Sequence, residues 1–290
     1  MNIFKTISAL AAVAAMALSL NNVSAQTSLA DSTLDPLNKR YMDTAARADS
    51  AIKARDWQMA ESLLQEAMDL KPGDPSNVLL MSNLGIVRQQ TGNYQGALDA
   101  LSAANVLAPA SVTVLTNRAR LYISLGEKEK AVKDYDRVIQ LDSTLIEPYF
   151  YRGMIAFSQG DIVQCDKDFA KLKHLDPDND YTLIAQATVC TATGRNADAV
   201  DYYKRLIQRE PASEYYGGLI ENYITMGEYN LAGETLGEAM HLYPMDPDFY
   251  VARAVLNKKR YMVDEAKADA RKAVQLGADP DMVNDILNNN

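Results

Sequence analysis

Four residues of this chain have side chains that often act as nucleophiles, bases or metal ligands: Cys165, His174, Cys190 and His241. A catalytic set needs such a group beside a second acid or base, and a zinc site needs spacings such as CxxC or HExxH. The four residues show neither arrangement. The glycines form no phosphate-binding loop, because they occur singly at regular intervals. The sequence therefore predicts a protein that is not an enzyme and that holds no metal and no cofactor.

The small residues, glycines and prolines recur instead at a fixed interval of about 34 residues. One phase of this repeat holds Ala97, Ala131, Cys165 and Ala199, a second holds the glycines Gly92, Gly126, Gly160, Gly194 and Gly227, and a third holds Pro109, Ser143, Pro177, Pro211 and Pro244. A fixed period of this length is typical of a solenoid, in which one supersecondary unit is stacked many times.

Each period contains two amphipathic stretches of about 13 residues, separated by the glycine, which predicts two antiparallel helices, A and B. Small residues on both helices, such as Ala119 and Ala131, allow the helix axes to cross closely. Proline ends helix B because it cannot donate a backbone hydrogen bond. The chain is thus predicted to be all-α, with seven units at residues 41–74, 78–111, 112–145, 146–179, 180–212, 213–246 and 247–280.

The sixth unit is irregular, because Gly217-Gly218 interrupts its helix A and Ile220 replaces the small residue at the helix crossing. Two interpretations are open. The glycines allow a partner backbone to approach closely, or the stack relaxes locally around Ile220.

This pattern of small, aromatic and proline positions resembles the tetratricopeptide-repeat family over about residues 41–280. The aromatic positions of that family recur at Tyr94, Tyr122, Tyr135, Phe169, Tyr203, Tyr223 and Tyr229. The resemblance implies a right-handed α–α superhelix whose A helices line a concave surface. It also implies a non-catalytic scaffold that binds a peptide or protein segment on that surface.

Carried over to this sequence, the resemblance gives a set of inward-facing residues in units two to five. The set comprises Asn83, Ile86, Asn117, Arg120, Phe150, Tyr151, Met154, Phe157, Tyr181 and Thr188. Asn83 and Asn117 share one phase, so we expect their amides side by side, where they could bond to an extended peptide backbone. The aromatic and Met side chains of unit four would take an apolar side chain. The alternative is that these residues face water or pack against neighbouring helices.

The lysines of the family's carboxylate clamp are absent, so we expect no ligand that is held by its C-terminal acid. Cys165 and Cys190 fall on neighbouring helices, where an oxidising compartment permits a disulfide. Two buried free thiols are the alternative.

Residues 1–25 have the pattern of a signal peptide: Lys5, an apolar run from residue 7 to 20, and the small residues Val23-Ser24-Ala25. We expect cleavage near Ala25 and a periplasmic or secreted mature chain. Residues 26–40 are polar and are expected to be a flexible lead-in, and residues 281–290 a C-terminal cap.

The formal net charge is -9 and no basic stripe is present, so the sequence does not favour nucleic acid as a partner. The apolar run is shorter than the roughly 20 residues that span a bilayer, so stable membrane insertion is not expected either. The expected partner is a protein or peptide of the cell envelope, in envelope assembly or secretion. Two alternatives are a glycan or cell-wall fragment stacked on Phe150, Tyr151 and Tyr181, and self-association as a homo-oligomer.

Overall fold

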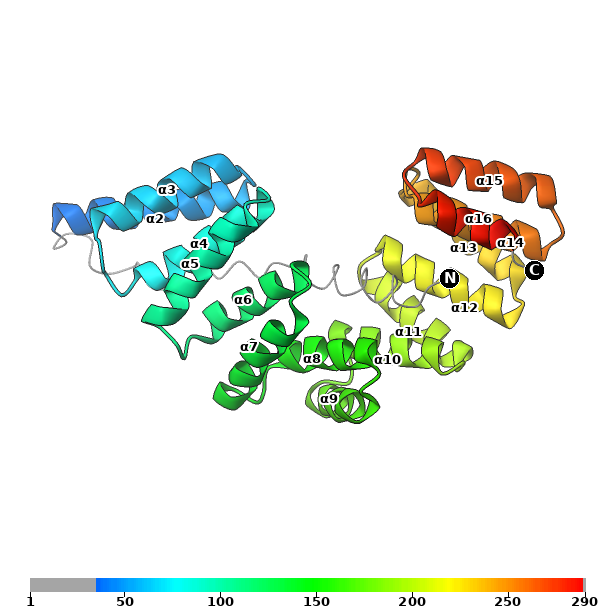
Figure 1. Ribbon diagram of the computed structural model, residues 1–290, viewed down its shortest axis with the longest axis horizontal. Coiled ribbons are helices and arrows are strands. Elements are labelled where there is room, and N and C mark those ends of the chain that lie inside the picture. Colours follow the sequence, from blue (N-terminus) through cyan, green and yellow to red (C-terminus); the bar gives the residue numbers. More distant parts are fainter. Residues whose placement is uncertain (1–34, 289–290) are drawn as a thin grey trace. The chain divides into compact units, whose positions relative to one another are not determined.

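The computed structural model describes residues 35–288, and the side chains up to residue 284. The predicted signal peptide and most of the predicted lead-in lie outside the described residues. The described part consists of fifteen α-helices without a β-strand (Figure 1). The all-α prediction is therefore confirmed.

In chain order the described helices alternate as helix A, with an even number, and helix B, with an odd number, through seven units, and one last helix follows. The units are α2 (Pro36–Lys53) with α3 (Trp57–Leu70), α4 (Asn77–Gln90) with α5 (Tyr94–Leu107), α6 (Val112–Ser124) with α7 (Lys128–Leu141), α8 (Ile146–Gln159) with α9 (Ile162–Leu175), α10 (Asp180–Ala192) with α11 (Asn196–Arg209), α12 (Ser213–Met226) with α13 (Tyr229–Leu242), and α14 (Pro247–Lys259) with α15 (Val263–Gln275). The last helix, α16 (Pro280–Asn288), occupies the segment that was expected to be a cap and packs on α14 and α15.

Helix α2 begins at Pro36, within the segment expected to be a flexible lead-in. Proline favours the first turn of a helix, because its φ angle is already suitable and that turn needs no donor from it. The lead-in prediction is therefore wrong for residues 36–40, which are helical.

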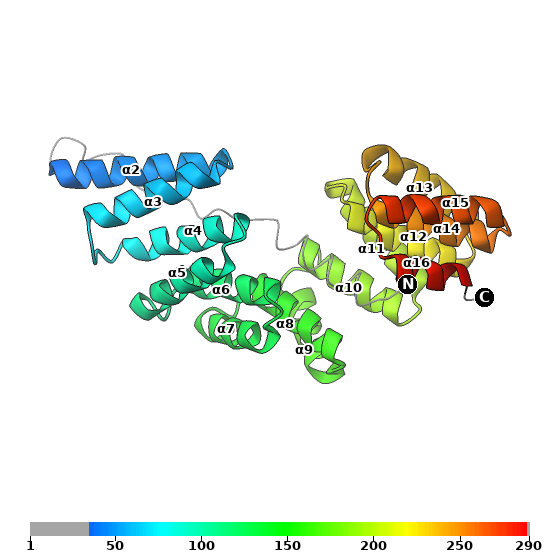
Figure 2. The ribbon, with the colours of Figure 1, turned by 45° about the horizontal axis from the view of Figure 1, so that its top comes forward.

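The described residues form two compact bodies, whose boundary falls inside α8. The N-terminal body comprises residues 35–155 and the C-terminal body residues 156–288. In each body a helix B packs beside its own helix A and against the helix A that follows (Figure 2). The A helices of successive units also meet, α4 with α6 in the N-terminal body and α12 with α14 in the C-terminal body. Each body therefore has a surface formed by neighbouring A helices.

The small residues at the predicted helix crossings are fully enclosed. Ala119 and Ala131 have exposed fractions of 0%, as do Ala187 and Ala199. At Gly85, a Cβ atom would lie 2.5 Å from Cγ of Leu101, so this position admits no side chain unless Leu101 moves. In the second, third and fifth units the small residues thus lie where the sequence places the helix crossings.

A recurrent aspartate shapes the connection from helix B to the next helix A. In each case its carboxylate accepts a hydrogen bond from the backbone N–H two residues later, which closes a local turn. The pairs are Asp74 with Ser76, Asp142 with Thr144, Asp176 with Asp178, Asp246 with Asp248 and Asp279 with Asp281, at 2.9–3.0 Å. The proline phase of the sequence marks this connection, and the aspartate supplies its hydrogen bond.

Candidate interaction surface

Side-chain hydrogen bonds join the A helices of the N-terminal body along one face. The amide nitrogen of Asn117 on α6 donates to the hydroxyl of Ser82 on α4 at 2.9 Å. Near the other end of these helices, Gln89 donates to the hydroxyl of Ser124 at 3.2 Å. These bonds fix α4 and α6 beside each other on the face that the sequence assigns to the predicted site.

An ion pair continues the connection from α6 to α8. Nε and Nη2 of Arg120 donate to the two carboxylate oxygens of Glu147, at 2.6 and 2.5 Å. Nη1 of Arg120 also lies 3.5 Å from Oδ1 of Asn117. Arg120 is buried, and such a two-pronged bond is among the stronger polar contacts in a protein. Arg120 therefore binds a carboxylate of its own chain rather than an acidic ligand.

The two asparagines of the predicted amide pair have different surroundings. The amide of Asn117 is engaged with Ser82 and Arg120. The side chain of Asn83 is 8% exposed and makes no hydrogen bond within the described residues. Ile86, one turn further along α4, is buried. Of the two side-chain amides, that of Asn83 is therefore the one that can donate and accept hydrogen bonds with a bound segment.

Phe150 and Tyr151, two of the aromatic residues predicted to bind a ligand in unit four, are core residues of the N-terminal body. The ring of Tyr151 stacks on Tyr135 of α7, with centroids 5.5 Å apart and planes 5° apart. Phe150 packs against Tyr151 edge to face at 5.2 Å, and Met154 is buried with them. The glycan alternative required exposed stacking rings at Phe150 and Tyr151, and the enclosed rings do not provide them.

The remaining predicted site residues, Phe157, Tyr181 and Thr188, belong to the C-terminal body. The hydroxyl of Thr188 donates to the carbonyl oxygen of Ile184 on its own helix at 2.8 Å. Tyr181 and Phe157 are half-buried. The predicted site is thus divided between the two bodies, and α4 with α6 holds the part that offers an unsatisfied polar group.

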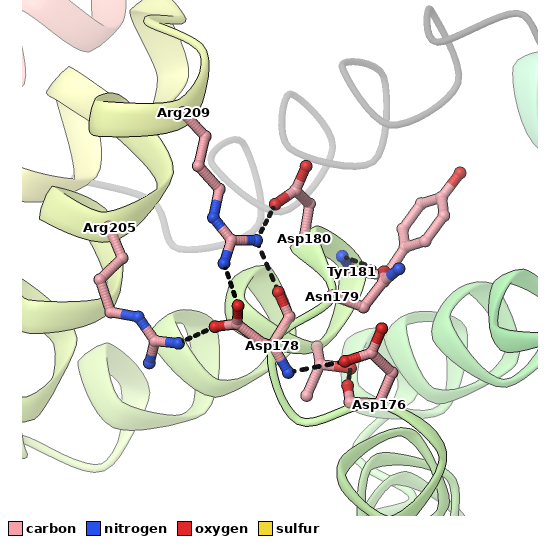
Figure 3. Close-up of polar contacts among 8 residues, drawn as sticks. Asp176, Asp178, Asn179, Asp180, Tyr181, Arg205 and Arg209 are labelled. Atoms are coloured by element: carbon pink, nitrogen blue, oxygen red, sulfur yellow. Dashed lines mark hydrogen bonds and ion pairs between the residues drawn. The ribbon is translucent and has the colours of Figure 1, made fainter.

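Tyr181 follows a turn that two arginines of α11 hold in place (Figure 3). Arg209 donates to both the carbonyl oxygen and the carboxylate of Asp178, at 2.5 Å, and to the carboxylate of Asp180 at 2.7 Å. Arg205 pairs with the same carboxylate of Asp178. The hydrogen bond from Arg205, with that from Arg209, lowers the pKa of Asp178. This exposed cluster fixes the start of α10.

The double glycine of α12 has a packing explanation. A Cβ atom at Gly218 would lie 2.3 Å from Cζ of Tyr203, because the ring of this α11 residue rests directly on the α12 backbone. Gly217 has open space around it, with no heavy atom within 4 Å of a Cβ at this position. Ile220 is fully enclosed at the helix crossing. Of the two glycines, Gly217 is therefore the one that leaves room for the backbone of a partner.

Cys165 and Cys190 are free thiols, and both are buried. The structure therefore has the alternative that the sequence left open, two buried free thiols, and not the disulfide. Burial raises the pKa of Cys165 to about 12 and also raises that of Cys190. His174 and His241 are exposed in the last turns of α9 and α13.

Within residues 35–288 no three His, Cys, Asp or Glu side chains form a group that could hold a metal ion. None of the helices in this range combines the length and apolar composition that a membrane-spanning segment requires.

Comparison with known families identifies the repeat. Two models described as tetratricopeptide repeats match residues 45–112 and 112–145, which extend from α2 to the turn before α8. The crystal structure of a tetratricopeptide repeat protein from Parabacteroides merdae superposes with a TM-score of 0.68 over 86% of this chain and 98% of that chain, at 24% identity. The chain is a tetratricopeptide-repeat protein.

Two curated relatives of this tetratricopeptide-repeat protein are much longer. Tetratricopeptide repeat protein 6 of Homo sapiens is 32% identical over 118 residues, which are 41% of this chain and 22% of that protein. A TPR repeat-containing protein of Methanocaldococcus jannaschii is 23% identical over 237 residues, 78% of this chain and 41% of that protein. Tetratricopeptide-repeat proteins bind protein partners, and the fold supports a general role as a protein-interaction scaffold.

Proposed function

We propose that this tetratricopeptide-repeat protein is a non-catalytic scaffold that binds an extended segment of another protein in its N-terminal body. The binding site is the helix A surface, which we define by Leu79 and Asn83 of α4 and Thr116 and Ile123 of α6. The observation that carries the proposal is the amide of Asn83, which makes no hydrogen bond within the described residues. A side-chain amide pairs with the N–H and C=O groups of an extended backbone, so a bound segment would satisfy it.

The surroundings of Asn83 favour a preformed site. The bonds from Ser82 through Asn117 and Arg120 to Glu147 hold α4, α6 and the start of α8 in fixed positions. A site that is already ordered loses less entropy when it binds. Leu79, 40% exposed, supplies apolar contact area on the same helix. Backbone bonding at Asn83 flanked by apolar contact suits an extended peptide better than a sugar.

We also propose that the partner is a protein of the cell envelope. The support is the signal-peptide pattern of residues 1–25, with which export to the periplasm or beyond is consistent. A mature chain that begins at Gln26 is the expected result of N-terminal sequencing on the protein purified from exporting cells. A chain that begins at Met1 in those cells would remove this part of the proposal.

Capture of partners from the envelope tests the binding site. Tagged full-length protein is cross-linked in cells and isolated, and its partners are identified by mass spectrometry. The test variant is Asn83→Ala/Thr116→Ala, which loses no hydrogen bond within the described residues. The matched control is Gln58→Ala/Ser62→Ala, two exposed polar residues of helix B α3.

We expect the control to retain every partner of the wild type and the Asn83→Ala/Thr116→Ala variant to lose at least one. Identical partner sets for the wild type and this variant would contradict the assignment of the site to the helix A surface. Circular dichroism confirms that both double variants remain helical.

A further inference from the structure

The A helices of the C-terminal body form a second surface with a different chemistry. Between α12 and α14 lies a pocket of about 140 Å³. Its lining consists of Ile220, Glu221, Ile224, Thr225, Ala252 and Val255. Aliphatic and small side chains therefore form most of its wall, and one carboxylate belongs to it.

Small residues keep this surface open. Gly217 and Gly218 of α12 occupy the repeat phases of Phe150 and Tyr151 in α8, and Ala252 of α14 shares the second of these phases. In α8 those two phases are filled by the buried rings of Phe150 and Tyr151. At Gly217 a side chain would meet no atom within 4 Å. Gly217 thus leaves open space beside the α12–α14 pocket, whereas the ring of Tyr203 covers Gly218.

Carboxylates without a basic partner accompany the pocket. Neither Glu221 nor Glu214, two turns earlier on α12, forms an ion pair with a lysine or arginine of the described residues. Burial raises the pKa of Glu214, and the nearby carboxylates of Asp246 and Asp248 raise it further. Burial also raises the pKa of Glu221. A half-buried carboxylate without a cation is unfavourable, and a cation from a ligand would stabilise it.

We propose that the groove between α12 and α14 binds a peptide segment in which a lysine or arginine lies next to a branched aliphatic residue. The aliphatic side chain enters the pocket between Ile224 and Val255, and the cation pairs with Glu221. The inference rests on the proposed function, because it assumes that A helices bind extended segments, but it concerns the C-terminal body alone. An acidic segment is disfavoured here, since like charges across an interface are repelled.

Peptide binding to the full-length protein tests the inference. The probe is a fluorescein-labelled peptide with a central Lys-Leu-Ser-Lys in a Gly-Ser background, and the readout is fluorescence anisotropy. Two further peptides replace both lysines by glutamate or the leucine by serine. We expect the lysine–leucine peptide to bind and each replacement to weaken binding about tenfold or more, the usual effect of losing one charge-assisted or apolar contact.

Matched variants locate the site. Glu221→Gln removes the carboxylate charge and should weaken binding about tenfold, whereas Glu234→Gln, on the exposed part of α13, should leave it unchanged. Gly217→Leu fills the open space on the groove side of α12 and should abolish binding. Gly237→Leu makes the same change at an exposed position of α13 that also has no neighbour within 4 Å, and should have no effect.

Equal affinity of wild type and Glu221→Gln for the lysine–leucine peptide would overturn the inference, and so would equal binding of the glutamate peptide. The inference would also be overturned if the lysine–leucine peptide showed no binding at millimolar concentrations of the protein. These failures leave the proposed function standing if Asn83→Ala/Thr116→Ala still loses a partner in cells. If that variant loses none while the peptide results hold, the N-terminal site is wrong and the α12–α14 groove is the binding surface.

Discussion

Gly217 and Gly218 are neighbours in α12, and replacing each by alanine gives a direct test of the packing between α11 and α12. A methyl group at Gly218 would lie 2.3 Å from Cζ and 2.5 Å from Cε1 of Tyr203. No pair of non-bonded carbon atoms is stable at that distance, so the ring must move. The same methyl group at Gly217 meets nothing within 4 Å.

The expected magnitudes follow from two terms. Replacing a glycine inside a helix by alanine stabilises the protein by about 0.5–1 kcal/mol, because the unfolded chain loses conformational freedom. Gly217→Ala carries only this term and should stabilise the fold. Gly218→Ala carries it as well, but inserting atoms into a packed core costs about 1–3 kcal/mol. The two variants should therefore differ in unfolding free energy by about 1–3 kcal/mol, with Gly218→Ala the less stable.

Tyr203 has little freedom to relieve the clash. Its side chain is almost fully enclosed, and its hydroxyl lies close to Thr191, which accepts a hydrogen bond from Asn222 at 2.9 Å. A ring that swings away from α12 would therefore have to displace enclosed neighbours. In the Gly218→Ala background, Tyr203→Leu should therefore cost less than it does alone, because the leucine no longer contacts the new methyl group.

The assay is urea unfolding followed by circular dichroism, with both alanine variants and the wild type measured under identical conditions. Equal midpoints for Gly217→Ala and Gly218→Ala would refute the reasoning. That result would mean that the Tyr203 ring does not rest on α12 and that the helix register of the fifth and sixth units is wrong.

Three further predictions concern the ion pair, a turn and the thiols. Arg120→Leu leaves the carboxylate of Glu147 without its partner and should destabilise the fold by about 3 kcal/mol in urea unfolding, whereas Arg120→Leu/Glu147→Leu should cost clearly less; a double variant as unstable as the single one would contradict this. The hydrogen bond from Lys71 lowers the pKa of Asp74 to about 2, below its ordinary value of 3.8. The ionised carboxylate of Asp74 therefore stabilises the folded protein fully above about pH 4, and this stabilisation is lost as the pH falls through 2. The thermal midpoints of wild type and Asp74→Asn should accordingly differ at pH 7 and converge near pH 2, and a difference that grows with acidity would reverse the assigned sign. Both buried thiols should resist a thiol reagent in the folded protein and react after denaturation, and rapid labelling of the native protein would show that they are exposed.

The helical architecture could be predicted from the sequence because the repeat reports packing directly. A small residue such as Ala119 or Ala131 is needed wherever two helices cross closely, so its spacing identifies the helices and their register. The sequence places the start of the first unit at residue 41, whereas α2 begins at Pro36. Residues 36–40 lack the apolar repeat pattern, and only the proline marks a helix start there. Polarity alone does not distinguish a lead-in from the exposed first turn of a helix.

The candidate site was less predictable, because the partner of a polar side chain comes from another unit. Asn117 bonds to Ser82, 35 residues away, and Arg120 to Glu147, 27 residues away. Repeat phase indicates the direction in which such a side chain points, but not whether a neighbouring unit supplies an opposite group. A signal was nevertheless present, since this spacing of an arginine and a glutamate places them at adjacent positions on successive A helices. Asn83 differs because no neighbouring unit supplies it with such a partner among residues 35–288.

Photo-cross-linking in cells tests the central claim, that the helix A surface of the N-terminal body binds a protein segment. A photoreactive phenylalanine analogue replaces Leu79 of α4 or, as the control, Met59 of α3, whose exposed fractions are 40% and 48%. The proposed function predicts a discrete adduct with a partner from the position of Leu79 and none from that of Met59. No adduct from the position of Leu79, or the same adducts from both positions, would contradict it.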